Sequence, residues 1–123
     1  PLTEMAEILP YADIVVLTIA LTKETTHLIC RETLRQMKET TILVNISRGA
    51  IADTNALIEW LEQNPHAGAA LDAFEEEPLD AASTLWSLDN VIATPHNSFV
   101  GEKNKIRLMN ITRQNLKLDP IHG

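Results

Sequence analysis

The sequence predicts an α/β fold, in which about four strands form a doubly wound parallel sheet with flanking helices. Three observations support this fold class. Short apolar runs of strand length recur along the chain, stretches with helical periodicity separate them, and Gly, Pro or Asn residues end most of these segments. Strands that alternate with helices form right-handed βαβ units, so these strands are expected to lie parallel to one another.

Four apolar runs are expected to be strands. The run at 11–20 (YADIVVLTIA) is almost continuous and rich in Val and Ile, which favours a strand that is covered on both faces. Further strands are predicted at 41–46, 68–74 and 91–94, and the last of these is followed by Pro95.

Helices are predicted at 1–9, 31–37, 53–63 and 101–118. The first has Thr3 as a candidate N-cap, and the third can be capped by Asp53 or Thr54. The residues expected to face the core from the third and fourth helices are Ala56, Leu57, Trp60 and Leu61, and Ile106, Met109, Ile111 and Leu116.

The composition excludes several classes of protein. With 123 residues, 45% hydrophobic and 22% charged, the chain is an ordinary globular sequence with a small core. A net charge of −7 argues against a nucleic-acid partner, and no apolar run is long enough to cross a membrane. No secretory signal is visible, and Cys30 has no second cysteine to pair with, so a cytoplasmic location is expected. No metal site is expected.

Polar residues follow the predicted strands at their carboxyl ends, where open parallel sheets bind ligands. Arg48 follows the second strand, Asp72 and the acidic run at 75–77 the third, and His96 the fourth. Arginine suits a carboxylate, and a histidine beside a carboxylate can exchange a proton near neutral pH. The set would suit a substrate with a carboxylate next to a hydroxyl or carbonyl carbon, and proton transfer coupled to hydride transfer.

Each of these residues also has a plainer interpretation when it is taken alone. Arg48 could be a surface residue, His96 a structural one, and the acidic run at 75–77 a solvated loop. Their joint placement after successive strands favours the functional interpretation.

Four motifs add a family resemblance. The chain resembles the C-terminal part of the NAD-binding domain of D-isomer-specific 2-hydroxyacid dehydrogenases, which implies a partial Rossmann-like sheet. The motifs are ADIV (12–15) with LTKET (21–25) and LI (28–29), NISRG (45–49) with Asp53 and Leu57, LDAFEEEPL (71–79), and NVIATPH (90–96).

The resemblance implies three catalytic residues. Arg48 would bind the carboxylate and carbonyl oxygen of the substrate, and His96 would be the general acid in ketoacid reduction and the base in the reverse direction. Glu77 would pair with His96 and favour its protonated form. The implied cofactor is NAD, with NADP left open, and the implied assembly is a homodimer.

The resemblance also implies a cofactor site. Asp72 would hydrogen-bond the nicotinamide carboxamide, the backbone of Ile46 and Ser47 would border the ring, and Arg48 lies beside it. The residues expected to line this site are Ile19, Ala20, Thr25, Ile46, Ser47, Arg48 and Asp72. Two departures from the family pattern are Ala20, where many members have proline, and Asn97-Ser98-Phe99, where many have glycines; Phe99 is expected to be a packing residue.

The glycine-rich loop that holds a dinucleotide pyrophosphate is absent from the sequence. Residues 1–123 are therefore expected to be the C-terminal portion of a nucleotide-binding domain, without the separate substrate domain. The strand within 13–19 would then be an exposed sheet edge, and the chain alone would be inactive. An inactive remnant and a cofactor-sensing corepressor-like binding module of the same fold stay open as alternatives, and the particular hydroxyacid is not determined.

Overall fold

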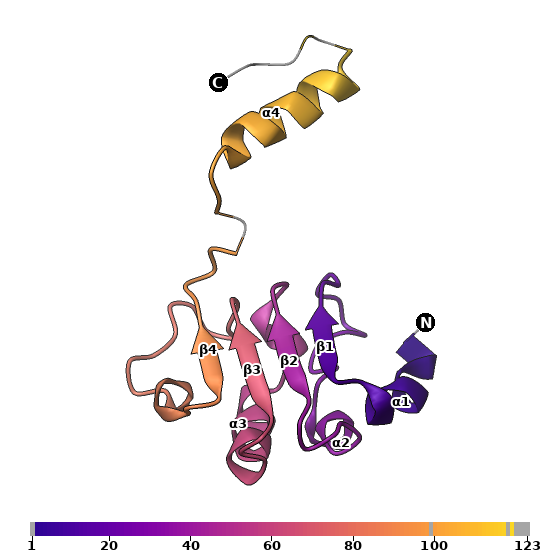
Figure 1. Cartoon of the computed structure of the whole chain (residues 1–123), viewed down its shortest axis with the longest axis vertical. Helices are drawn as coiled ribbons and strands as arrows, with labels where there is room; N and C mark the ends of the chain where they lie inside the picture. Colours follow the sequence, from indigo (N-terminus) through magenta and orange to yellow (C-terminus); the bar gives the residue numbers. More distant parts are fainter. Residues whose placement is uncertain (1, 99, 118, 120–123) are drawn as a thin grey trace.

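The computed structural model describes residues 2–98, 100–117 and 119. Its centre is a sheet of four parallel strands in sequential order, β1 (Ile14–Leu17), β2 (Ile42–Asn45), β3 (Gly68–Leu71) and β4 (Val91–Ala93) (Figure 1). The predicted α/β class and the predicted strands are confirmed, and each strand is shorter than the apolar run that predicted it.

Helices precede, separate and follow the strands. They are α1 (Met5–Ile8), α2 (Arg31–Leu34), α3 (Thr54–Gln63) and α4 (Asn104–Asn115), with short 3₁₀ turns η1 (Leu2–Glu4), η2 (Leu9–Tyr11), η3 (Gly49–Ile51) and η4 (Thr84–Ser87). The helix predicted at 1–9 is divided between two of these turns and α1, whose N-cap is Glu4 rather than Thr3. Within the described residues, no helix has the length and apolar character needed to cross a bilayer.

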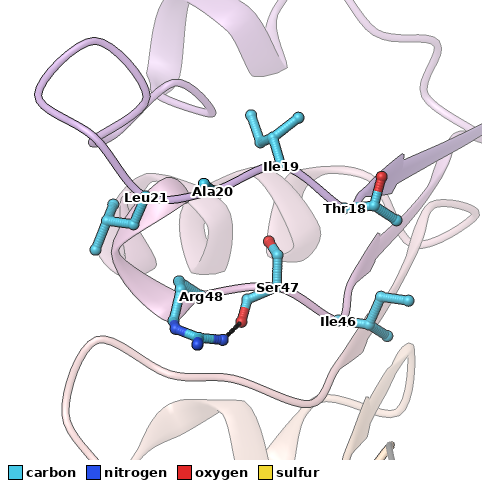
Figure 2. Close-up of a pocket in the computed structure, with 7 residues that line it drawn as sticks. All are labelled: Thr18, Ile19, Ala20, Leu21, Ile46, Ser47 and Arg48. Carbon is cyan, nitrogen blue, oxygen red and sulfur yellow. Dashed lines mark hydrogen bonds between the residues drawn. The ribbon is translucent and has the colours of Figure 1, made fainter. Parts of the chain in front are cut away.

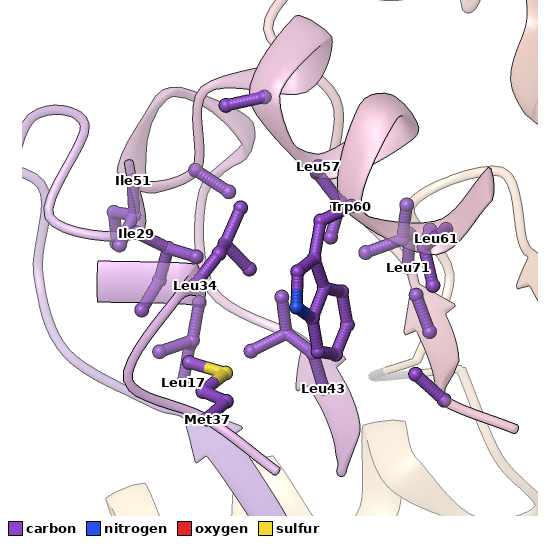
Figure 3. Packing of buried hydrophobic residues seen from close by; sticks show 14 of the residues in the cluster. Leu17, Ile29, Leu34, Met37, Leu43, Ile51, Leu57, Trp60, Leu61 and Leu71 are labelled. Carbon is purple, nitrogen blue, oxygen red and sulfur yellow. The ribbon is translucent and has the colours of Figure 1, made fainter. Parts of the chain in front are cut away.

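Helix α3 closes the hydrophobic core as predicted. The Asp53 carboxylate accepts a hydrogen bond from the Ala56 N–H at 3.0 Å and caps the helix. The four predicted residues of α3 are all buried, and they pack with side chains of the sheet and α2 (Figure 3). Burial of each large side chain contributes about 1.5–3 kcal/mol, so this contact fixes α3 and the turn before it. The main residues of this core are Leu17, Leu34, Leu43, Ile51, Leu57, Trp60, Leu61 and Leu71.

The opposite face of the sheet is uncovered by the described residues. Ile14 and Val16 of β1 are 59% and 51% exposed, and Ile42 of β2 and Ile92 of β4 are also exposed. The prediction that the first strand is covered on both faces is therefore wrong for the described structure. The reason is topological, because sequential parallel strands with right-handed crossovers place α2 and α3 on one face. Among the strands of the described structure, β1 pairs with β2 alone, so the predicted apolar edge is present.

Helix α4 makes no core contact. None of its residues is buried, and Figure 1 shows the helix clear of the sheet. The prediction that Ile106, Met109, Ile111 and Leu116 face the core is wrong, since Ile106 is half-buried and the other three are exposed. Their apolar character predicted burial, but the described residues do not bury them. The predicted packing of Phe99 and the expected end of this helix at 118 lie outside the described residues.

Candidate active site

The loops after the strands bring a histidine and a glutamate into contact. The Nδ1 atom of His96 lies 2.9 Å and 3.0 Å from the two carboxylate oxygens of Glu77. The Phe74 N–H also donates to Glu77 at 3.0 Å. The hydrogen bonds from His96 and Phe74 lower the pKa of Glu77, so this carboxyl is ionised beside the imidazole. Among the described residues, no hydrogen bond is found at Nε2 of His96.

His96 has an unusual backbone conformation. Its φ angle is 50°, in the left-handed region that a non-glycine residue adopts only when its surroundings hold it there. The buried Asp72 supplies much of that support, because its carboxylate accepts hydrogen bonds from the Asn97 N–H at 2.8 Å, the Ser98 N–H at 2.9 Å and the Thr94 hydroxyl at 2.5 Å.

Asp72 is ionised in this environment. Burial opposes the charge, but the hydrogen bonds from Ser98, Thr94 and Asn97 outweigh burial and hold the pKa of Asp72 well below its usual range. The family resemblance implies that Asp72 hydrogen-bonds the nicotinamide carboxamide. The described contacts of its carboxylate are with the segment around His96, and the carboxamide role stays a prediction.

Arg48 lies in the turn after β2, which the buried Asn45 holds. The Asn45 amide donates to the Arg48 carbonyl at 3.0 Å, and its oxygen accepts from the Ser47 N–H and hydroxyl. The Arg48 Nη1 donates to the Ser47 carbonyl at 2.7 Å, as Figure 2 shows. Arg48 makes no direct ion pair with Glu77, but its positive charge contributes to the lowered pKa of that carboxyl.

The turn that contains Arg48 is in close backbone contact with the loop that contains Glu77. A Cβ atom on Gly49 would lie 1.8 Å from the carbonyl carbon of Phe74 and 2.3 Å from the Glu75 nitrogen. Two stretches of backbone therefore meet at a distance that only glycine allows. This contact fixes how far Arg48 stands from Glu77 and His96.

A pocket of about 550 Å³ opens at the carboxyl ends of β1 and β2 (Figure 2). Five of the seven residues predicted to line a cofactor site, Arg48 among them, line this pocket. Thr18 and Leu21 also line the pocket; they were not among the predicted residues, although they adjoin predicted positions in the sequence. Its exposed aliphatic walls and polar backbone fit a flat, partly apolar ring such as nicotinamide. The lining residues are Thr18, Ile19, Ala20, Leu21, Ile46, Ser47 and Arg48.

Thr25 lies outside the pocket lining and contacts Ala20, one of the lining residues. It is buried, it is not among the lining residues, and its hydroxyl donates to the Ala20 carbonyl at 2.8 Å. Its role is thus to hold the loop after β1, and direct contact with a cofactor stays a prediction. In the described part of the chain, no group of three His, Cys, Asp or Glu side chains could hold a metal ion.

Comparison with known proteins identifies the family of this chain. The family model for the NAD-binding domain of D-isomer-specific 2-hydroxyacid dehydrogenases matches residues 1–98, which is most of the chain. The chain belongs to this family. The resemblance inferred from the four motifs is thereby confirmed, as is the Rossmann-like fold class.

Similar proteins in the family are longer than this chain. A glyoxylate reductase of Pyrococcus horikoshii is 51% identical over 92 residues, covering 75% of this chain and 27% of that protein. A glyoxylate reductase of Thermofilum pendens is 42% identical over 114 residues, covering 93% of this chain and 34% of that protein. The chain therefore spans about a third of the length of these relatives.

A solved structure shares the fold. The D-isomer-specific 2-hydroxyacid dehydrogenase of Xanthobacter autotrophicus Py2, in complex with NADPH and MES, superposes with a TM-score of 0.76 at 32% identity. The similarity covers 97% of this chain and 50% of that chain.

Proposed function

We propose that the protein is an oxidoreductase that interconverts a D-2-hydroxyacid and a 2-ketoacid with a nicotinamide cofactor. The observation that carries this proposal is the contact between the Glu77 carboxylate and His96 Nδ1, at the same rim as Arg48 and the pocket of β1 and β2. NAD is the proposed cofactor and NADP is the second candidate, since the Xanthobacter relative is described with NADPH.

The three residues divide the work on the substrate. The Arg48 guanidinium would bind the substrate carboxylate, because its planar fork matches two oxygens. His96 would donate a proton from Nε2 to the carbonyl oxygen during reduction and accept it during oxidation. The ionised Glu77 favours the protonated imidazole, which is the form that reduction needs. The bound nicotinamide would supply or accept the hydride.

Residues 1–123 would supply the C-terminal portion of the NAD-binding domain, in a cytoplasmic homodimer. The absence of a glycine-rich loop from this sequence supports the view that this portion alone is inactive. The uncovered apolar sheet face is compatible with further protein surface against it, and the free Cys30 suits a reducing compartment.

The test uses the protein expressed from its complete gene. Glyoxylate and pyruvate would be offered with NADH and, separately, with NADPH, and cofactor oxidation followed by absorbance. We expect reduction of at least one ketoacid, and we expect no turnover from residues 1–123 alone. Failure of the complete protein to oxidise either cofactor with any 2-ketoacid would refute the proposed function.

A further inference from the structure

A second contact between a histidine and a glutamate lies beside the candidate active site. The Nε2 atom of His27 is 2.5 Å from one carboxylate oxygen of Glu75. The other oxygen of Glu75 accepts the N–H of Thr54, the first residue of α3, at 3.0 Å. Burial opposes the charge on Glu75, but the hydrogen bonds from Thr54 and His27 outweigh burial and lower the pKa of this carboxyl. One side chain thus joins the loop after β1 to the start of α3.

The position of His27 is fixed by a hydrogen bond from its backbone N–H. Its φ angle is 50°, and its N–H donates to the Ala50 carbonyl of η3 at 2.9 Å. Gly49, next to Ala50, is in direct backbone contact with Phe74 and Glu75. The loop after β1, the Arg48 turn and the segment after β3 therefore meet at Glu75.

Glu75 is linked to the pair of Glu77 and His96 by a short stretch of backbone and two hydrogen bonds. Glu75 follows Phe74, whose N–H donates to Glu77, and Glu77 contacts His96. Fixing Glu75 fixes the short segment from which Glu77 reaches Nδ1 of His96. An ordinary exposed ion pair contributes little to the stability of a protein. In this pair, however, each carboxylate oxygen of Glu75 accepts a hydrogen bond from a different segment of the chain.

We propose that His27 and Glu75 are positioning residues, which hold Glu77 in its contact with His96. The inference rests on the proposed function only in assigning His96 the proton transfer. The charged group beside Glu75 is His27. The charged groups around Glu77 are His96 and Arg48. Two further carboxylates, Glu76 and Asp80, line the same pocket as Glu75.

The experiment compares four variants of the complete protein. Glu75→Ala removes both contacts of the carboxylate, and His27→Ala removes one of them. His27→Gln retains an amide that can reach Glu75, so it tests for rescue. Glu76→Ala is the matched control, because this neighbouring glutamate is exposed and makes no hydrogen bond within the described residues.

The first readout is the pH dependence of ketoacid reduction. We expect Glu75→Ala and His27→Ala to lower kcat about tenfold, less than the roughly hundredfold loss that a 1 Å misplacement can cause. The alkaline limb of the profile should move to lower pH, because a misplaced Glu77 stabilises protonated His96 less. KM for the cofactor should change less than about twofold, as the pocket of β1 and β2 does not include either residue. His27→Gln and Glu76→Ala should resemble the unaltered protein.

The second readout does not require activity. The Nδ1 signal of the His96 ring, which reports the contact with Glu77, would be followed by NMR at one fixed pH in the cofactor-free protein, and it should shift in Glu75→Ala and His27→Ala. If the unaltered protein turns over no substrate, the proposed function fails while this signal still decides the positioning role. Variants that melt at a lower temperature but keep the His96 signal and the pH profile of the unaltered protein would overturn the inference.

Discussion

Replacement of Gly49 by alanine tests how the two halves of the candidate active site are held together. The added Cβ would lie 1.8 Å from the Phe74 carbonyl carbon and 2.1 Å from its oxygen, where ordinary contact begins near 3.4 Å. The neighbours are backbone atoms, so no side chain can rotate away. The two segments must separate by roughly 1.5 Å, and overpacking of this kind costs about 1–3 kcal/mol in stability.

The separation should harm catalysis more than folding. It moves Arg48 away from Glu77 and His96, and a misplacement of about 1 Å can lower the rate roughly a hundredfold. We therefore expect kcat/KM for ketoacid reduction in the complete protein to fall by about that factor, with a lower melting temperature.

The matched control for this substitution is Gly68→Ala in β3. There the added atom meets its nearest neighbours, Asn90 and Ile42, at 3.5 Å and 3.9 Å, which are ordinary contacts. Its stability should stay within about 0.5 kcal/mol of the unaltered protein. If Gly49→Ala were no more harmful than Gly68→Ala in both assays, the close backbone contact would not hold the site.

Three further changes test other parts of the structure. Glu77→Gln removes the negative charge beside His96, so the alkaline limb of the pH–rate profile for ketoacid reduction should move to lower pH in steady-state kinetics. An unchanged pH–rate profile would contradict the pairing of Glu77 with His96. Asp72 has a lowered pKa, so it stabilises the fold above the ordinary carboxyl pKa of about 3.9 and loses this effect as pH falls. Asp72→Asn should cost about 1–3 kcal/mol at pH 7 in denaturant unfolding, and the difference from the unaltered protein should shrink toward pH 2. Asp53→Ala removes the cap of α3 and should cost about 1 kcal/mol by thermal unfolding, whereas Asp89→Ala on an exposed loop should cost little.

The parallel sheet and the pair at its rim could be predicted from the sequence because both follow from local patterns and one topological rule. Apolar β-branched runs marked β1 and β2, and the face of Leu57, Trp60 and Leu61 marked α3. The carboxyl ends of parallel strands share one edge, so the acidic run at 75–77 and His96 are expected at the same rim, and the family resemblance then implies that Glu77 is the residue that pairs with His96.

Burial could not be predicted with the same success, because it depends on which surfaces face each other. The run containing Ile14 and Val16 has the apolar character of a strand covered on both faces, yet the described helices cover one. In the same way, Met109 and Ile111 are exposed apolar residues on a helix that has no buried residue in the described structure. Hydrophobic periodicity reports which residues favour burial, and it does not identify the surface that buries them.

The supports of the active site were missed for a different reason. His27 and His96 both adopt left-handed backbone conformations, which neither strand nor helix patterns predict for histidine. Their side chains reach carboxylates 48 and 19 positions away in the sequence, so the two pairs depend on how the loops after β1, β3 and β4 converge. The proposed proton transfer involves Glu77 and His96, and we infer that Asp72 supports the segment around His96 while Glu75 supports the segment around Glu77. A substitution at either support should therefore alter the protonation of His96 without touching the substrate.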